Sequence, residues 1–348
     1  MRAVVFAGSR SVRLDDVREP ALVDPTDALV RPSLCGICGT DLHLIGGDFP
    51  GVEPGLVLGH EFVGSVVEVG SAVQHVRPGE RVFASDFVAC GACRWCDRGD
   101  HWECAQRAFF GTGAAFGPPL SGAQAELVRV PFADVALMRV PAACSDESAI
   151  LLADNLPTGW VAIERSGLAP GEVLAVIGGG AVGQLASMCA QAAGAGIVVV
   201  VEPSAERRRF AEAHGALAAA PEDAERLIRE LTDGDGADVV VEAVGRDAAL
   251  TSALQLVRRR GRIVSVGAHA AERWELPLAK CFADEISFSF AIGDAIRVRR
   301  TLLALLGTRA LDPSDVVGAR VSFEGAPGAY AELAALRAMK VVIDPRKP

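Results

Sequence analysis

The chain has 348 residues, half of them apolar, and carries a formal net charge of -10 at pH 7. Its length exceeds that of one ordinary hydrophobic core and predicts two domains. The acidic balance opposes a nucleic-acid partner, because no basic stripe outweighs the negative surface. The N-terminal residues 1–8 predict a strand and a turn and lack the features of a secretion signal, so we expect a cytoplasmic protein.

Two different sequence patterns follow one another along the chain. Residues 1 to about 150 contain short β-like runs separated by Gly and Pro, which predicts a mainly antiparallel domain whose loops carry function. These runs are Ala3–Ala7, Asp27–Pro32, Glu61–Val69, Arg81–Ala84 and Gln124–Val130. From about 160 to 290, strands alternate with helices, which predicts a doubly wound parallel sheet.

The predicted strands of this second region are Val173–Ile177, Ile197–Val201, Val239–Val244 and Arg262–Val266. The predicted helices are Gln184–Ala193, Glu206–His214, Ala224–Leu231 and Ala248–Arg259, and Ala216–Pro221 is expected to be a helix end and a loop. The uncharged run Val173–Val201 is long enough to span a bilayer, but its glycines favour a buried β-α-β unit. We therefore expect no membrane partner. The C-terminal helices Ile296–Leu306 and Ala329–Met339 and the strand Lys340–Ile343 are predicted to return to the first domain.

Four cysteines lie within 15 residues of one loop: Cys90, Cys93, Cys96 and Cys104. Four thiolates can surround one zinc ion tetrahedrally and leave no position for a substrate, so this loop predicts a structural zinc site. The alternatives are two disulfides or four unrelated core cysteines, and both fit poorly in a chain without a secretion signal.

A glycine signature follows the predicted strand Val173–Ile177 and precedes a predicted helix. Its members, Gly178, Gly180 and Gly183, have the spacing at which a dinucleotide pyrophosphate approaches a helix N-terminus. The next strand ends in Glu202, which can bind ribose hydroxyls and would repel a 2′-phosphate, so NAD is favoured over NADP. Downstream residues could bind a phosphate if this acid turned away: Ser204, Arg207 and Arg208. A glycine turn without a ligand is the plainer alternative.

Three further segments carry metal-ligand types: C-G-T-D-L-H at Cys38–His43, G-H-E at Gly59–Glu61 and L-L-A-D-N-L-P-T-G at Leu151–Gly159. With the four-cysteine loop and the glycine signature, they resemble the zinc-dependent alcohol dehydrogenases of the medium-chain dehydrogenase/reductase family over nearly the whole chain. The resemblance implies an α/β protein with a GroES-like, mainly-β catalytic domain and a Rossmann cofactor domain. The catalytic domain would comprise residues 1–155 and 293–348, with the zinc lobe at 90–104, and the Rossmann domain 156–292.

The resemblance also implies site residues. Cys38, His60 and Asp154 would bind a catalytic zinc, the second of two per subunit, with its fourth position open to substrate. Glu61 would lie near this zinc, and Asp41 would orient the ligand histidine. Many family members have Cys or Glu where this chain has Asp154.

In the mechanism that the resemblance implies, zinc stabilises an alkoxide, and hydride passes to NAD(P) as an aldehyde or ketone forms. Thr40 would take the alcohol proton and pass it through the nicotinamide ribose to His43, which reaches solvent. Thr158 would pack against the nicotinamide, and Lys340 would approach the pyrophosphate. The alternatives are a formaldehyde-dismutase-like enzyme, which the L-P-T-G after Asp154 resembles, or a reductase of C=C or C=N bonds.

The substrate is a small alcohol or carbonyl that the sequence does not name. Asp86 occupies a position that in the resembling enzymes often bears an apolar wall of the substrate pocket. It either faces a polar or cationic substrate or turns outward in a reshaped loop. Four aromatic residues could line the cleft or pack the lobe: Trp102, Phe109, Phe110 and Phe116. The apolar run Ile286–Ile292 predicts a sheet edge that pairs with a second copy, giving a homodimer or homotetramer.

Overall fold

The computed structural model describes residues 1–8 and 10–347, and the chain forms two compact units. The first unit comprises Met1–Asp154, Asp294–Gly307 and Ser314–Pro348, and the second comprises Asn155–Gly293 and Thr308–Pro313. The chain passes from the first unit to the second after Asp154 and returns after Gly293. Each of these boundaries lies one residue from the predicted one, which was after residue 155 and before residue 293. The short segment Thr308–Pro313 belongs to the second unit, whereas the sequence places it in the first.

The first unit is built on a seven-stranded sheet in the order β16-β17-β3-β4-β5-β9, with β8 paired to β3. Its strands are β3 (Ala28–Ile37), β4 (Phe62–Val69), β5 (Arg81–Ala84), β8 (Val128–Val130), β9 (Leu137–Arg139), β16 (Ala319–Val321) and β17 (Val341–Ile343). Two small sheets pair β1 (Arg2–Gly8) with β2 (Ser11–Asp16) and β6 (Phe87–Val88) with β7 (Ala108–Phe109). The predicted strand Gln124–Val130 is reduced to its last three residues.

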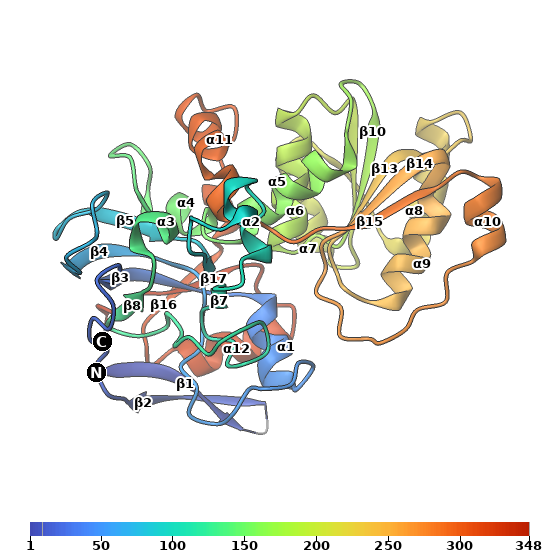
Figure 1. Cartoon of the computed structure of the whole chain (residues 1–348). Helices are drawn as coiled ribbons and strands as arrows, with labels where there is room; N and C mark the ends of the chain where they lie inside the picture. Colours follow the sequence, from blue (N-terminus) through green and yellow to red (C-terminus); the bar gives the residue numbers. More distant parts are fainter. Residues whose placement is uncertain (9, 348) are drawn as a thin grey trace. The chain divides into compact units, whose positions relative to one another are not determined.

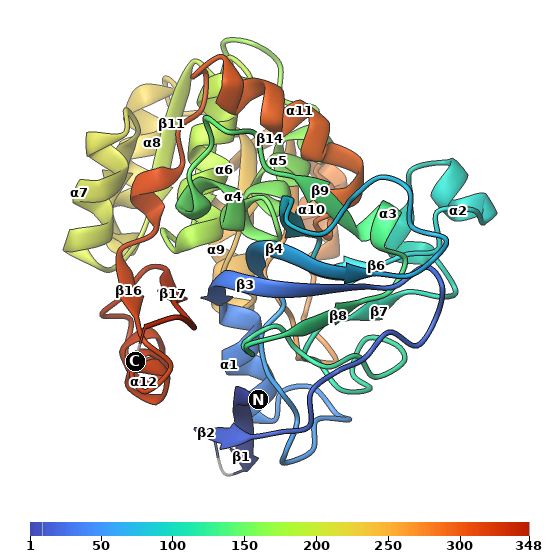
Figure 2. The same cartoon turned by 90° about the vertical axis from the view of Figure 1, so that its left-hand side faces the viewer.

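The pair β3 and β4 positions much of the site, and the two strands run side by side in Figure 2. Their register shifts between Pro32 and Leu34, because Pro32 has no backbone N–H to donate to the ladder. Opposite this shift, a Cβ on Gly64 would lie 2.2 Å from the carbonyl oxygen of Arg31, so glycine permits the close approach. Beyond it, Cys35 pairs with Phe62, which brings the end of β3 beside the start of β4.

Short helices connect the strands of the first unit. They are α1 (Gly39–Gly46), α2 (Arg94–Asp97), η1 (His101–Glu103), α3 (Ala133–Ala136), α4 (Asp146–Leu151), α11 (Ala295–Gly307), η2 (Ser314–Val316) and α12 (Ala326–Ala334). One core cluster contains Phe62 and Phe110, whose rings meet edge to face with centroids 5.5 Å apart. A second cluster packs α12 and β17 against the end of β3 through Tyr330 and Phe323.

The second unit is a six-stranded parallel sheet in the order β12-β11-β10-β13-β14-β15, which confirms the predicted doubly wound class. Its strands are β10 (Val173–Ile177), β11 (Ile197–Val201), β12 (Leu217–Ala219), β13 (Ala237–Glu242), β14 (Val257–Ser265) and β15 (Ser287–Phe290). Its helices are α5 (Asn155–Ser166), α6 (Ala181–Ala192), α7 (Ala205–Ala213), α8 (Pro221–Leu231), α9 (Asp247–Leu256) and α10 (Leu278–Ala283). Helices α5 and α6 lie on one side of this sheet and α8 and α9 on the other (Figure 1).

Two sequence predictions in this unit are wrong. The helix predicted at Ala248–Arg259 ends at Leu256, because Val257 pairs with Ala237 and begins β14. The stretch Ala216–Pro221 contains the edge strand β12, which pairs with β11, and Pro221 begins α8. In both places hydrogen bonds to a neighbouring strand override the local helical preference of alanine and leucine. Among the described residues, no helix has both the length and the apolar character needed to cross a membrane.

Candidate active site

The four cysteines of the loop come together as predicted from their spacing. Their sulfur atoms all lie within 4.8 Å of one another, and none forms a disulfide. The Sγ of Cys96 lies 3.6 Å from that of Cys93 and 3.9 Å from that of Cys90. Zinc–sulfur bonds of about 2.3 Å in a tetrahedron separate the sulfurs by about 3.8 Å, so the cluster fits one zinc ion.

Hydrogen bonds and burial set how readily these thiols become thiolates. Backbone amides of Cys90 and Gln106 each donate to the Sγ of Cys104 at 3.4 Å. Backbone hydrogen bonds, chiefly from Cys96, lower the pKa of Cys93 to about 6. Burial raises the pKa of Cys96 to about 12, so this thiol needs the metal to become a thiolate.

A second group of possible metal ligands comprises Cys38, His60, Glu61 and Asp154, whose ligand atoms lie within 4.8 Å of one another. Cys38 is the residue before α1, His60 and Glu61 directly precede β4, and Asp154 follows α4. The carboxylate oxygen Oδ2 of Asp154 lies 3.3 Å from Cys38 Sγ and 3.4 Å from His60 Nε2. Ligands about 2.1 Å from a tetrahedral zinc ion are about 3.4 Å apart.

Burial and charge support a cation at this second group. His60 is 1 % exposed, and its Nε2 has no hydrogen-bond partner, so this nitrogen can bind a metal ion. Burial raises the pKa of the Cys38 thiol, and the nearby Asp154 charge adds to the effect. Burial would also raise the pKa of Asp154, but the neighbouring His60 ring, whose Nε2 lies 3.4 Å from Oδ2, outweighs it and lowers this pKa to about 2. The residues present therefore fit a catalytic zinc.

Asp41 lies where the resemblance expects an orienting carboxylate. It is fully buried, and its Oδ1 is 3.4 Å from His60 Nδ1, the ring nitrogen that faces away from Asp154. Its Oδ2 accepts a hydrogen bond of 2.9 Å from the backbone amide of Cys38. One carboxylate thus contacts two of the predicted ligands.

The two predicted relay residues both lie on α1. The Oγ1 of Thr40 is 3.9 Å from Cys38 Sγ, so its hydroxyl is beside the metal group. His43 is one helical turn further on, and its Nδ1 is 2.6 Å from Oδ2 of Asp48. Asp48 was not among the residues predicted from sequence, and a carboxylate after the helix gave no recognisable signal.

Lys340 has a protein partner that the sequence analysis does not predict. Its ammonium is 1 % exposed and donates to Oε2 of Glu61, which is fully buried beside the metal group. Burial raises the pKa of Glu61, and the charge of Lys340 opposes that rise. The close passage of Gly36 is part of this arrangement, since a Cβ there would lie 2.0 Å from Glu61 Oε2. Lys340 therefore neutralises Glu61, and its predicted approach to a pyrophosphate stays a prediction.

Two residues that support the site were not predicted from the sequence. Gln124 is fully buried, its amide nitrogen donates to the Gly36 carbonyl at 2.9 Å, and its oxygen accepts from the Tyr330 hydroxyl at 3.0 Å. Gly59, the residue before His60, has φ +89°, and a Cβ there would lie 2.4 Å from Gln124 Cγ. These contacts hold the segment that carries His60. Only the folded chain brings them together, so no local motif could have found them.

Aromatic rings extend from the metal group. The centroid of the Phe109 ring is 5.2 Å from that of His60 and 5.7 Å from that of Phe116. The ring centroids of Phe116 and Phe49 are 4.9 Å apart. Trp102 meets Phe109 edge to face and lies under the guanidinium of Arg107. Phe110 is fully buried in the sheet core. Asp86 is only 5 % exposed, so its side chain is not turned outward into solvent.

The glycine signature forms the predicted strand–turn–helix. Gly178 has φ +95°, and a Cβ on Gly183 would lie 1.8 Å from the Gly178 carbonyl oxygen, so α6 packs closely on the loop. Gly180 is the residue before α6. The carboxylate of Glu202 accepts hydrogen bonds from the amides of Gly179 at 2.7 Å and Ser204 at 2.9 Å.

Two other predicted cofactor residues lie in the same unit. A guanidinium nitrogen of Arg207 is 4.0 Å from the Cβ position of Gly180, so this cation lies beside the loop. Thr158 is 7 % exposed in α5 and packs closely against Gly293, where a Cβ would lie 2.4 Å from its hydroxyl. Its predicted contact with a nicotinamide stays a prediction.

Comparisons with known proteins agree with this architecture. The profile of the alcohol dehydrogenase GroES-like domain matches residues 24–142, and that of the zinc-binding dehydrogenase domain matches residues 181–307. The chain is 37% identical over 332 residues to a protein of Mycobacterium tuberculosis named a probable zinc-binding alcohol dehydrogenase, covering 95% of this chain and 85% of that one. The chain belongs to the zinc-dependent alcohol dehydrogenases of the medium-chain dehydrogenase/reductase family.

Solved structures extend the likeness to the whole fold. An alcohol dehydrogenase from Thermus sp. ATN1 matches with a TM-score of 0.93 and 39% identity over 99% of both chains. A zinc-binding dehydrogenase of Sinorhizobium meliloti, solved with NADP, matches with a TM-score of 0.83 and 29% identity over 99% of both chains. The family assignment supports an oxidoreductase that uses zinc and a nicotinamide cofactor, with the predicted GroES-like and Rossmann domains.

Proposed function

We propose that this protein interconverts an alcohol with its aldehyde or ketone, using NAD as the hydride acceptor. The observation that carries the proposal is the group of Cys38, His60 and Asp154 with the Thr40 hydroxyl beside it. Three protein ligands leave one position of a tetrahedral zinc ion open to a substrate oxygen. Zinc bound there supplies Lewis acidity, which makes an alcohol hydroxyl more acidic near neutral pH.

The remaining chemistry is assigned to side chains of this chain. The Thr40 hydroxyl accepts the proton of the alcohol, and His43 exchanges a proton with solvent, since 16 % of its side chain is exposed. Asp48 accepts from Nδ1 of His43, which leaves Nε2 as the nitrogen that takes up or releases the proton. Asp41 orients the ring of His60 through its Oδ1, which lies 3.4 Å from Nδ1.

NAD is proposed over NADP because of Glu202. Its carboxylate is held by the amides of Gly179 in the glycine loop and of Ser204 after β11, and its charge there would repel a 2′-phosphate. Arg207 beside Gly180 is the opposing feature, and it stands near enough to attract a phosphate. Steady-state rates with NAD and NADP at equal alcohol concentration show whether the charge of Glu202 or that of Arg207 determines the cofactor preference.

The function is tested with the purified, zinc-loaded enzyme. We expect two zinc ions per chain and NAD-dependent oxidation of alcohols, followed as absorbance of NADH. Cys38→Ser should lose one zinc ion and at least a thousandfold in turnover, because the metal loses a thiolate ligand. Cys144→Ser, which changes a thiol outside both groups, is the matched control and should behave as wild type. A fully zinc-loaded enzyme without activity on any alcohol, ketone or aldehyde would contradict the proposal.

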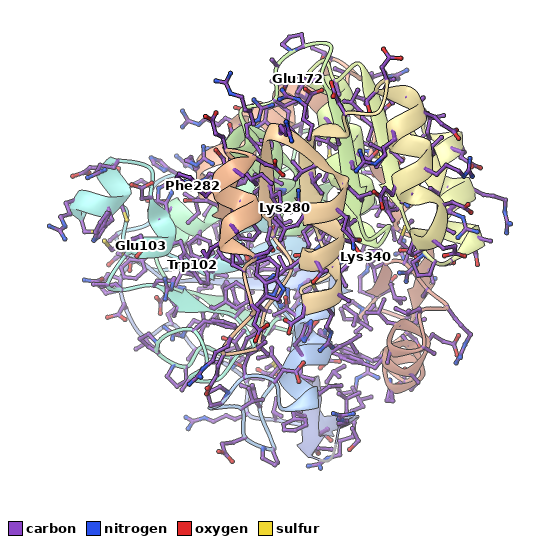
Figure 3. All side chains as sticks on the ribbon, turned by 90° about the vertical axis from the view of Figure 1, so that its right-hand side faces the viewer. Trp102, Glu103, Glu172, Lys280, Phe282 and Lys340 are labelled. Carbon is purple, nitrogen blue, oxygen red and sulfur yellow. The ribbon has the colours of Figure 1, made fainter. Side chains whose placement is uncertain are left out.

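We further propose that two copies pair through the second unit. Strand β15 is the edge of the parallel sheet, and Phe290 and Ile292 at its end are 60 % and 51 % exposed. Phe282 on the neighbouring α10 is 87 % exposed and projects from the surface in Figure 3. An apolar edge with unpaired backbone groups is covered by a second copy through the same edge. Light scattering should give at least a dimer, and Phe290→Asp should weaken it.

A further inference from the structure

We propose that His101 and Asp294 form a positioning pair, through which the zinc lobe at residues 90–104 sets the affinity of the protein for its nicotinamide cofactor. The lobe then does more than stabilise itself, because it holds the start of α11 where the chain returns from the second unit. This inference rests on the proposed use of NAD, and it adds a coupling between the four-cysteine group and cofactor binding.

One carboxylate joins α11 to the zinc lobe. Asp294 directly precedes α11, and His101 begins the short helix η1 of the lobe. The backbone amide of His101 donates to Oδ2 of Asp294 at 3.0 Å, and Nδ1 of the His101 ring lies 3.1 Å from the same oxygen. With a proton on Nδ1, the ring donates a second hydrogen bond. The side chains of His101 and Asp294 are 12 % and 9 % exposed, so water competes little for this pair.

The same carboxylate fixes the first turn of α11. Its Oδ1 accepts from the backbone amide of Arg297 at 3.0 Å, which is the hydrogen bond of a helix N-cap. Asp294 thus accepts from the helix with one oxygen while its other oxygen accepts from the lobe. A displacement of the lobe is therefore transmitted to the start of the helix through a single side chain.

Apolar contacts hold the same two segments together. Ile296 of α11 is 9 % exposed and belongs to one core cluster with Cys96 and Cys104 of the lobe. The Cδ of Arg297 lies 3.4 Å from the position of a Cβ on Gly99, so its aliphatic chain passes close to the lobe backbone. Two of the four cysteines that fit a zinc ion are therefore packed with the first turn of α11. Metal in the loop keeps these side chains in place, so the packing of the helix start depends on it.

The residue before Asp294 is held by the second unit. This residue is Gly293, with which the main segment of the second unit ends. Gly293 lies against Thr158, since a Cβ on this glycine would be 2.4 Å from the Thr158 hydroxyl oxygen and 3.2 Å from its Cα. Thr158 is the residue that the family resemblance places beside the nicotinamide. Two residues joined by one peptide bond are thus held in different units, Asp294 by the lobe and Gly293 by α5.

A junction that is already ordered favours cofactor binding. When the contact with the lobe is lost, Gly293 and Thr158 gain freedom that the cofactor must remove on binding. Ordering one backbone residue costs enough free energy to change an affinity by about tenfold. Loss of the pair should therefore weaken the binding of NADH by about this factor, with both zinc ions retained.

Titration of the zinc-loaded protein with NADH, followed by the fluorescence of bound NADH, measures this affinity. His101→Leu removes the ring contact and should raise the Kd for NADH by about tenfold. His101→Asn should restore most of the affinity, because the asparagine amide can donate to the Asp294 carboxylate in place of Nδ1. His75→Leu, which changes an exposed histidine of the same unit, is the matched control and should bind NADH as the wild type does.

Two more variants separate this coupling from a loss of stability. Asp294→Ser keeps an N-cap oxygen for α11 but removes the carboxylate that contacts the lobe. Its Kd, that of His101→Leu and that of the double variant should agree within about threefold, because all three lack the same contact. Cys104→Ser, studied at a temperature at which it is folded, should weaken NADH binding to a similar extent. A role in folding alone would lower the melting temperature and leave each Kd unchanged.

An unchanged Kd in fully zinc-loaded His101→Leu overturns the coupling, whatever its stability, and so does additive weakening in the double variant. If His101→Leu does not fold, Asp294→Ser decides by the same criterion. If the wild-type protein binds NADH and oxidises alcohols while every variant binds NADH equally well, only the coupling is lost and the proposed function stands. A zinc-loaded wild-type protein that binds no NADH removes the proposed function itself.

Discussion

Replacing Lys340 by methionine tests whether this ammonium serves the protein interior or the cofactor. Its Nζ donates to Glu61 Oε2, and the side chains are 1% and 0% exposed. The other oxygen of Glu61 has no hydrogen-bond partner. Lys340→Met keeps the length of the side chain and leaves the Glu61 carboxylate buried near Asp154 without its ammonium partner.

The expected loss in the free energy of unfolding is about 3–5 kcal/mol at pH 7, the range for a buried ion pair that loses one partner. An independent limit comes from protonating the carboxyl. Glu61 has an ordinary pKa of 4.5, and holding a proton on such a group at pH 7 costs about 3 kcal/mol. The double variant Lys340→Met with Glu61→Gln should recover most of the loss, because the unpaired charge of Glu61 is then removed as well.

Urea unfolding at equal zinc content measures these free energies, and titration with NADH measures cofactor affinity in the same variants. Lys347→Met removes an exposed lysine of the same terminal segment and is the matched control. A loss below about 1 kcal/mol, together with a tenfold weaker affinity for NADH, would refute the structural reasoning. Lys340 would then act on the pyrophosphate, as the family resemblance implies.

Three further outcomes are expected. Cys104→Ser should lose one zinc ion and have a lower thermal stability. Cys38→Ser should lose one zinc ion and its turnover but keep the fold. Metal analysis and calorimetry measure both variants, and the opposite pattern would show that the structural and catalytic sites were assigned the wrong way round. Gly183→Ala would place a Cβ 1.8 Å from the Gly178 carbonyl oxygen, so displacement of α6 should weaken NADH binding and cost about 1–3 kcal/mol of stability. Unchanged affinity would contradict the close packing. Two arginines help to lower the pKa of Asp344 from 3.8 to about 2, so its contribution of about 2 kcal/mol is present above pH 4 and lost as pH falls toward 2. Asp344→Asn should show a correspondingly smaller acid-induced loss of stability in urea titrations, and an identical loss would count against the ion pairs.

The sequence alone determined the features that a short stretch of backbone can specify. The four-cysteine loop places its thiols together within 15 residues, so spacing and ligand chemistry suffice to predict the cluster. The glycine signature is equally local, because Gly178 needs a positive φ and Gly183 must have no Cβ where the helix meets the loop. Both could be found from residue type and order.

The proposed zinc ligands could be predicted only through the family resemblance, because β3, β4 and α4 bring Cys38, His60 and Asp154 together from distant parts of the chain. Tertiary structure alone decided the partner of Lys340 and the inward position of Asp86. Side chains far apart in sequence meet there in a packed interior, where the cost of an unpaired charge selects the partner. No local pattern records that selection, since it depends on which surfaces the fold removes from water.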